Sequence, residues 1–327
     1  MPHRRARWIA ATLSLMFGCA RPEEGAPVAP APSPSALAPR PVPAPEIAVV
    51  PAVTASPRQA PVYPWLADPA CRAPAVVDAL EDRFAPPAGF ARAPVSPRSF
   101  GAWLRRLPLA APGTPVVSHR GAVILPPDHP NLAAVVAIDI GSRDLQQCAD
   151  SILRLHAEWQ YAEGRRDLTY RAANRAPIPF ARWARGERTV AEGAGFSWTT
   201  SGRADDSHAS LRGWLDAVFM YANTGSLARD TDRVGLADLR PGDFVVQPGA
   251  PGHAVLVLDV ARAADGRRAL LLGQGFMPAQ SFQVLERAGR RRHGHDPWFI
   301  VEPGDLALDT PFWAPFPWSA LRRFPGA

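Results

Sequence analysis

The chain contains no lysine, so all 36 of its cationic Lys or Arg side chains are arginine. These arginines are scattered, and the formal net charge of +6 indicates a compositional bias more than a nucleic-acid surface. Three cysteines are too few for a disulfide scaffold. The sequence also lacks internal repeats, a glycine-rich phosphate loop, a zinc-type cluster of Cys and His, and a carboxylate pair with convincing glycosidase spacing. We therefore expect no metal, no organic cofactor and no nucleic-acid partner.

The N-terminus lacks an apolar run long enough to cross a bilayer, which takes about 20 residues. Three arginines among the first seven residues precede a short apolar stretch that ends at Gly18 and Cys19. A basic start, a short apolar run and a small residue before a cysteine resemble a bacterial lipoprotein signal. Residues 1–19 are thus predicted to be a signal peptide with Cys19 as the lipidation site. A soluble secreted protein is the alternative.

Proline is abundant, with 38 residues, and much of it lies before residue 65. Residues 20–62 combine Pro, Ala, Val and Ser without apolar periodicity, which is typical of a disordered, semi-extended tether. The hydrophobic fraction of 47% is enough for a core, and residues 63–327 are predicted to form a single globular domain. An exported, lipid-anchored tether would hold this domain in the cell envelope, on the periplasmic side or at the outer membrane.

The pattern of the folded part predicts an α+β domain. Residues 74–84 and 99–107 have helical patterns, and residues 133–140 form an apolar β-run. A longer helix is expected over residues 144–163, with Asp144 as its N-cap and Cys148 near its first turn. Three strands follow later, at 244–247, 253–262 and 268–275, and the last two are joined by a turn at Asp265-Gly266.

Cys148 is a candidate nucleophile. A thiol at a helix N-terminus lies in a positive field, which is expected to lower its pKa and favour the thiolate. A disulfide with Cys71 and a buried, inert thiol are the two alternatives.

His253 is a candidate base because Gly- and Pro-rich residues precede it and a regular strand follows, which fixes its ring. Its alternative role is a packed or turn-capping histidine. The other histidines with no such setting are predicted at the surface: His156, His208, His293 and His295.

The register of the last two strands predicts a third member of the site. If Arg262 faces Arg267, Val255 faces Gln274, and side-chain alternation then puts His253 and Gln274 on one face. Gln274 is therefore expected to orient the imidazole.

Two further glutamines complete the predicted site. Gln280 is the alternative orienter, or a substrate-binding residue. Gln147 and the backbone N–H of Cys148 are candidates for binding an oxyanion.

Several sequence segments resemble the bacterial exported family called domain of unknown function 4846. They are residues 99–104, 107–109, 143–150, 251–255, 274–280 and 296–298. The resemblance covers about residues 63–324 and implies an exported bacterial protein without an assigned activity. The segment from Leu239 to His253 also resembles NlpC-type cell-wall cysteine peptidases. That resemblance implies a papain-like antiparallel sheet packed against a helix that carries the cysteine, with helical inserts.

Together these features predict a possible papain-like amidase or peptidase in the cell envelope. Peptidoglycan or an envelope peptide is the expected partner. The first alternative is a non-catalytic module on the same fold that binds a peptide or glycan. The second is a carbohydrate-binding protein that uses Trp313 and Trp318 in the aromatic C-terminal segment. The sequence does not predict an oligomeric state.

Overall fold

The computed structural model describes residues 62–287 and 296–326, which belong to one compact unit formed by residues 58–327. The predicted signal peptide, Cys19 and nearly all of the predicted tether lie outside the described residues, as do His293 and His295. None of the helices in the described ranges combines the length and apolar character needed to cross a membrane.

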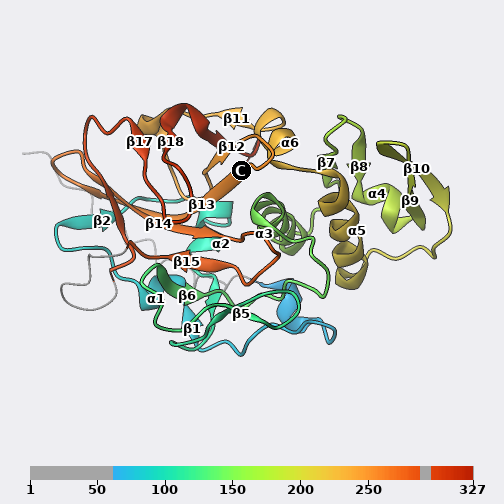
Figure 1. The fold of residues 1–327 in the computed structure, drawn as a ribbon, viewed down its shortest axis with the longest axis horizontal. Helices are drawn as coiled ribbons and strands as arrows, with labels where there is room; N and C mark the ends of the chain where they lie inside the picture. Colours follow the sequence, from blue (N-terminus) through green and yellow to red (C-terminus); the bar gives the residue numbers. More distant parts are fainter. Residues whose placement is uncertain (1–61, 288–295, 327) are drawn as a thin grey trace, which may run out of the picture. The chain divides into compact units, whose positions relative to one another are not determined.

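The core of the described unit is an antiparallel sheet with helices on one side (Figure 1). Seven strands follow the order β11-β19-β12-β13-β14-β15-β6, while β16 also pairs with β14 and β2 with β13. Their bounds are β2 Phe90–Arg92, β6 Leu132–Val135, β11 Asp232–Arg233, β12 Phe244–Gln247, β13 His253–Ala263, β14 Arg268–Gln274, β15 Gln283–Leu285, β16 Phe299–Val301 and β19 Leu321–Arg323.

The sheet is covered on both faces, and β13 lies at its centre. Ala254, Leu256 and Leu258 of β13 pack in the larger apolar cluster, together with the helix α3. Val255 and Val257 point to the opposite face, into a second cluster. Burial on both faces explains why β13 reads as a nearly continuous apolar run and not as an alternating one.

Helices and short hairpins surround this sheet. The helices are α1 Leu80–Arg83, α2 Phe100–Arg105, α3 Cys148–Ala162, α4 Phe180–Ala184, α5 His208–Tyr221 and α6 Thr224–Arg229. Two-stranded pairs are formed by β1 Asp78–Ala79 with β3 Pro108–Leu109, β4 Val116–Val117 with β5 Val123–Leu125, β7 Thr169–Arg171 with β8 Pro177–Pro179, β9 Glu187–Glu192 with β10 Gly195–Thr200, and β17 Ala307–Leu308 with β18 Phe316–Pro317. Short 3-10 turns are η1 Pro64–Ala67, η2 Leu236–Asp238 and η3 Trp318–Ala320.

The predicted mixture of helix and antiparallel strand is confirmed, but several boundaries differ. The long helix begins at Cys148 and not at Asp144, and Gln147 occupies its N-cap. Asp144 instead accepts a hydrogen bond from the backbone N–H of Ala279, at 2.7 Å. The helix expected over residues 74–84 is reduced to the single turn α1, because Asp78 and Ala79, in the middle of that range, pair as β1 with β3.

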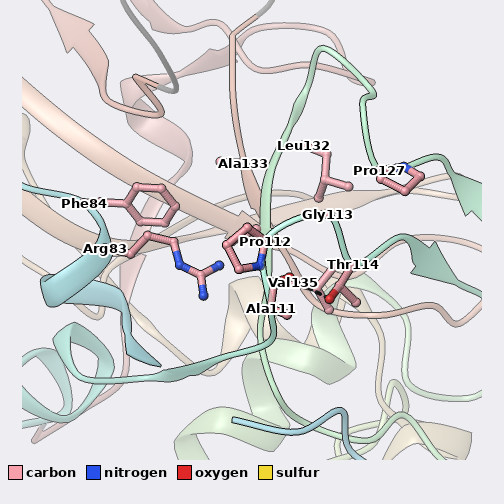
Figure 2. Close-up of a pocket in the computed structure, with 11 residues that line it drawn as sticks. Arg83, Phe84, Ala111, Pro112, Gly113, Thr114, Pro127, Leu132, Ala133 and Val135 are labelled. Carbon is pink, nitrogen blue, oxygen red and sulfur yellow. Dashed lines mark hydrogen bonds between the residues drawn. The ribbon is translucent and has the colours of Figure 1, made fainter. Parts of the chain in front are cut away.

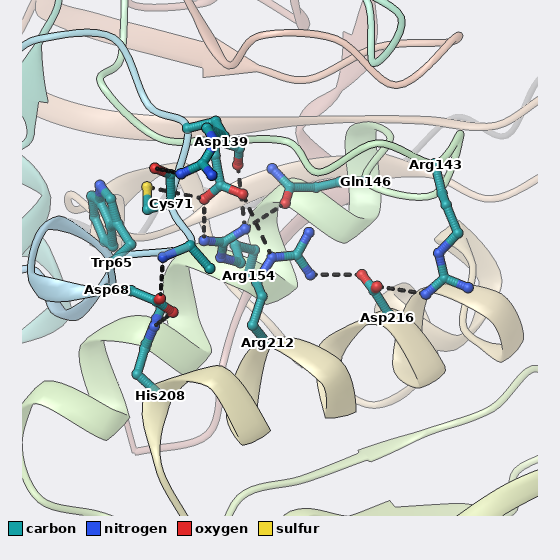
Figure 3. A network of polar contacts seen from close by, with 12 residues as sticks. Trp65, Asp68, Cys71, Asp139, Arg143, Gln146, Arg154, His208, Arg212 and Asp216 are labelled. Carbon is teal, nitrogen blue, oxygen red and sulfur yellow. Dashed lines mark hydrogen bonds and ion pairs between the residues drawn. The ribbon is translucent and has the colours of Figure 1, made fainter.

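A buried ionic network fastens α3 to α5 and to the segment after η1 (Figure 3). Arg154 and Glu158 of α3 have fully buried side chains and pair at 2.8 Å. Arg154 also pairs with Asp139 at 3.0 Å. Burial alone would raise the pKa of Glu158 and Asp139. The charge and hydrogen bonds of Arg154, together with His208 at Glu158 and Arg212 at Asp139, outweigh burial and hold both pKa values below their usual range. The two carboxylates are therefore ionised in the interior.

His208 closes this network at the first residue of α5. Its Nδ1 lies 2.7 Å from Asp68 and its Nε2 lies 3.0 Å from Glu158. The surface position predicted for His208 is wrong, since its side chain is 13% exposed, and the same holds for His156, which is 6% exposed. Burial alone would lower the pKa of His208, but the carboxylates of Glu158 and Asp68 outweigh it and raise this pKa.

Removal of Arg154 alone should destabilise the fold strongly. Arg154→Met leaves buried, ionised Glu158 and Asp139 without their main cation, and such a loss typically costs about 3–5 kcal/mol. The matched variant Arg154→Met with Glu158→Gln removes both charges of the pair and should lose clearly less. The measurement is the free energy of unfolding by urea. Equal losses of unfolding free energy in the two variants would show that the unpaired charge of Glu158 is not the cause of the destabilisation.

The contacts of His208 with Asp68 and Glu158 should make the stability of the fold depend on pH. Because the folded pKa of His208 is raised, its contribution is complete below the unfolded value of about 6.5 and is lost as pH rises through the higher folded value. Urea unfolding between pH 6 and 9 should show this loss in the wild type. His208→Gln should flatten the dependence. An unchanged pH profile in His208→Gln would contradict the assignment.

Candidate functional site

Cys148 lies against the start of the central strand. It is the first residue of α3, and its Sγ is 3.9 Å from the carbonyl oxygen of Gly252. The backbone N–H of Ala254 is also directed at this sulfur. The thiol therefore contacts the peptide units on both sides of His253.

One glycine makes this close seating of α3 possible, and a second keeps the turn before His253 tight. A Cβ on Gly275, directly after β14, would lie 2.9 Å from the carbonyl oxygen of Gln147 and would collide with the side chain of Ser151. A Cβ on Gly252 would lie 2.8 Å from the carbonyl oxygen of Gln247. Both values are shorter than real Cβ contacts, so larger residues would push the first turn of α3 or the β12–β13 turn out of place.

His253 and Gln274 form a buried pair. Nε2 of His253 lies 2.8 Å from Oε1 of Gln274, and both residues are 0% exposed. The predicted sharing of one face is confirmed, although the assumed starting pair was wrong. Arg262 faces Arg268 and not Arg267, and a bulge between Val257 and Asp259 then restores the predicted offset, since Leu256 faces Gly273.

The hydrogen bond to Gln274 defines the state of the imidazole. An amide oxygen only accepts, so Nε2 carries the proton and Nδ1 keeps its lone pair. Nδ1 is buried and has no hydrogen-bond partner among the described residues. Burial lowers the pKa of His253 to about 4, although the bond to Gln274 acts in the opposite direction. The ring is therefore neutral at pH 7, with an unused basic nitrogen.

The thiol is neutral as well. Burial, and then the charge of Asp150, raise the pKa of Cys148 to about 11, against backbone N–H groups that lower it. The expectation that the helix N-terminus would lower this pKa is wrong, because Cys148 is only 4% exposed and desolvation outweighs the helix field. Cys71 and Cys148 are both free, so the disulfide alternative is also wrong.

The ring and the thiol reach the strand start from different sides. α3 packs on the face of Ala254, whereas His253 shares the face of Val255 by strand alternation. The hydrogen bond of Sγ goes to Gly252, and that of the imidazole goes to Gln274. Proton transfer between them would therefore need a rearrangement that brings the thiol and the imidazole to the same face of β13.

The other predicted glutamines have separate positions. Gln147 donates from Nε2 to Asp144 at 3.1 Å, so its amide is engaged at the rim. Gln280 is 2% exposed, its Oε1 has no partner among the described residues, and its backbone bridges to Ser118. The hydrogen bond to Nε2 of His253 is made by Gln274 and not by Gln280.

Asp150 is a site residue that sequence reasoning missed. Its Oδ2 accepts the backbone N–H of Gln147 at 3.1 Å, and its Oδ1 is buried without a partner among the described residues. Burial raises the pKa of Asp150 to about 8. In a sequence, an acidic residue at the third position of a helix usually indicates a capping residue. That pattern does not indicate that the carboxyl of Asp150, two residues from Cys148, is un-ionised.

Two hollows lie away from these residues. One, of about 230 Å³, is lined by Arg83, Phe84 and residues near β6 (Figure 2). The other, of about 290 Å³, lies beside His156 and Phe324. Neither is lined by Cys148, His253 or Gln274. In the described ranges, no group of three or more His, Cys, Asp or Glu side chains is arranged to hold a metal ion.

Comparison with known families adds one finding. Residues 80–323 match the family described as a domain of unknown function (4846). The chain belongs to this family. The match spans α1 to β19 and thus includes all three residues of the candidate site, which makes the site part of the 4846 domain. No curated protein and no solved structure matches the chain, so the NlpC resemblance gains no support.

The state of the thiol can be measured by the pH dependence of alkylation. Iodoacetamide should label Cys148 slowly at pH 7.5, with an apparent pKa near 11 and well above the free value of about 8.5. Asp150 is ionised where the thiol titrates, so Asp150→Asn should lower the apparent pKa. Asp144→Asn, at the exposed rim, is the control. Labelling is assigned by peptide mass mapping. Labelling faster than that of a free thiol would contradict the buried, neutral assignment.

Proposed function

We propose that this protein is an exported, lipid-anchored cysteine amidase or peptidase of the cell envelope, with a papain-like arrangement of Cys148, His253 and Gln274. One observation carries the proposal. The hydrogen bond to Gln274 fixes Nε2 of a buried imidazole and leaves Nδ1 as a free base, next to the backbone that the thiol contacts. A structural histidine would normally have both ring nitrogens satisfied.

The chemistry follows from the neutral state of both groups. As Sγ of Cys148 attacks the amide carbonyl carbon, Nδ1 of His253 takes the thiol proton, and Gln274 holds the imidazolium that forms. The imidazolium then protonates the leaving amine while the C–N bond breaks, which leaves a thioester. Water attacks this thioester with His253 as base, which releases the acid and restores the thiol.

The first turn of α3 supplies the oxyanion site. The backbone N–H groups at a helix N-terminus have no intrahelical acceptors, and that of Cys148 lies at the reacting atom. Gln147 can add a second donor if its amide leaves Asp144. The burial of the site would make these dipoles more effective than in water.

A non-catalytic envelope module is the second candidate, and the closure of the site favours it. Cys148 is 4% exposed and His253 and Gln274 are 0% exposed, so the three residues pack like a core as the structure stands. Such a module would bind a peptide or glycan on its surface while the polar pair only fixes the strand register.

Covalent trapping separates the two candidates. A panel of peptides that end in a vinyl sulfone should form a thioether at Cys148, seen by intact mass and peptide mapping. His253→Ala should slow the reaction by about 10²–10⁴-fold, the usual contribution of a general base. Cys71→Ser is the matched control and should react like the wild type. Failure of every peptide to modify Cys148, or a rate unaffected by His253→Ala, would favour the binding module.

A further inference from the structure

His253 is covered by aromatic rings from two loops. The ring centroids of Phe276 and Trp313 each lie 4.9 Å from the imidazole centroid, and that of Phe316 lies 6.1 Å away. Phe276 follows β14, whereas Trp313 and Phe316 come from the segment between β17 and the end of β18. The aromatic cap is defined here as Phe276, Phe312 and Trp313.

The cap is open to solvent in a way that a core is not. Phe312 is 40% exposed, and its ring stacks on His129 at 5.7 Å and lies 6.3 Å from Phe276. Its φ of 70° is in the left-handed region, which costs a non-glycine residue about 1–3 kcal/mol. Core burial does not offset this cost at an exposed ring, so the conformation points to a functional use of the side chain.

The cap is less buried than Phe316, the ring beneath it. Trp313 donates from Nε1 to Oε1 of the exposed Gln247 at 3.0 Å, across from His253 in the β12–β13 ladder. Phe316, three residues later, is 0% exposed, belongs to the second apolar cluster and pairs within β17–β18. Phe312 and Trp313 are therefore accessible from solvent, whereas Phe316 forms the buried base beneath them.

The chemistry of the cap selects its occupant. Residues 311–318 carry no charged side chain, and neither do residues 275–280. An anion placed among these rings would lose its hydration without a cation from either segment, which is costly. A lysine ammonium would meet the ring faces but no carboxylate from these segments. Gln247 Oε1 already accepts from Trp313, so the cap favours ring and methyl contacts over the hydroxyls of a sugar.

We infer that the aromatic cap is the specificity site of this protein and binds an uncharged, apolar side chain of the substrate next to the scissile amide. This inference rests on the proposed function, because it assigns the group beside the reacting bond. The entering side chain takes the place of Trp313 against Phe276 and Phe312, and the displacement uncovers His253. Access to the base and recognition of the substrate are then one event.

The test uses vinyl sulfone peptides that differ only in the residue beside the warhead: Phe, Leu, Glu or Lys. The rate of adduct formation at Cys148 should be more than about 10-fold higher for Phe and Leu than for Glu and Lys, within the range that an apolar pocket gives. Phe312→Ala and Trp313→Ala should remove this preference. Trp318→Ala is the control, because its indole donates to Asp305 and lies outside the cap.

The outcomes distinguish the two proposals. Equal rates of adduct formation for apolar and charged peptides would overturn the proposal that the aromatic cap is the specificity site. The proposed hydrolase function would still stand. If no peptide forms an adduct, the proposed hydrolase function is wrong, and the role of the aromatic cap is then tested by binding alone. Amides of the same peptides without a warhead should then shift the indole N–H resonance of Trp313 only when the end residue is Phe or Leu. No shift, or an equal shift with Glu and Lys, would overturn the inference.

Discussion

The seating of the first turn of α3 on the ends of β13 and β14 is the constraint on which the site depends. Gly275 allows backbone to meet backbone there, and the ionic network around Arg154 and Glu158 fastens the same helix to α5. Because the first turn of α3 packs there, the thiol of Cys148 contacts the peptide units that flank His253. The same seating leaves the thiol and the imidazole on different faces of β13, so proton transfer between them requires a rearrangement.

The seating of α3 also removes the site from water. This desolvation determines the protonation states of Cys148 and His253. The pKa of Cys148 is raised to about 11 and that of His253 is lowered to about 4, so both shifts favour the uncharged forms. A preformed thiolate–imidazolium pair is therefore not the resting state. The base is present but unused, and the event that activates it must come from outside the pair. The aromatic rings above His253 are the elements through which a substrate can supply that event.

The sequence predicts the members of the site better than their state. Strand alternation identifies Gln274 as the partner of His253, because a period of two is a local property. The bulge at Val257 is not encoded in any obvious residue, and the prediction reached the right face only because that bulge compensates for a wrong starting pair. The thiol pKa and the burial of His208 depend on segments far apart in the chain, such as Asp68 near the start of the domain. Local patterns carry no information about that assembly.

The most direct measurement is the nitrogen-15 NMR spectrum of the His253 ring as a function of pH. We predict a neutral ring with the proton on Nε2 and a lone pair on Nδ1 at pH 7, and protonation only near pH 4. His253→Gln identifies the signals. A proton on Nδ1 at neutral pH, or an ordinary transition near pH 6.5, would contradict the claim that the protein holds His253 as a free, buried base.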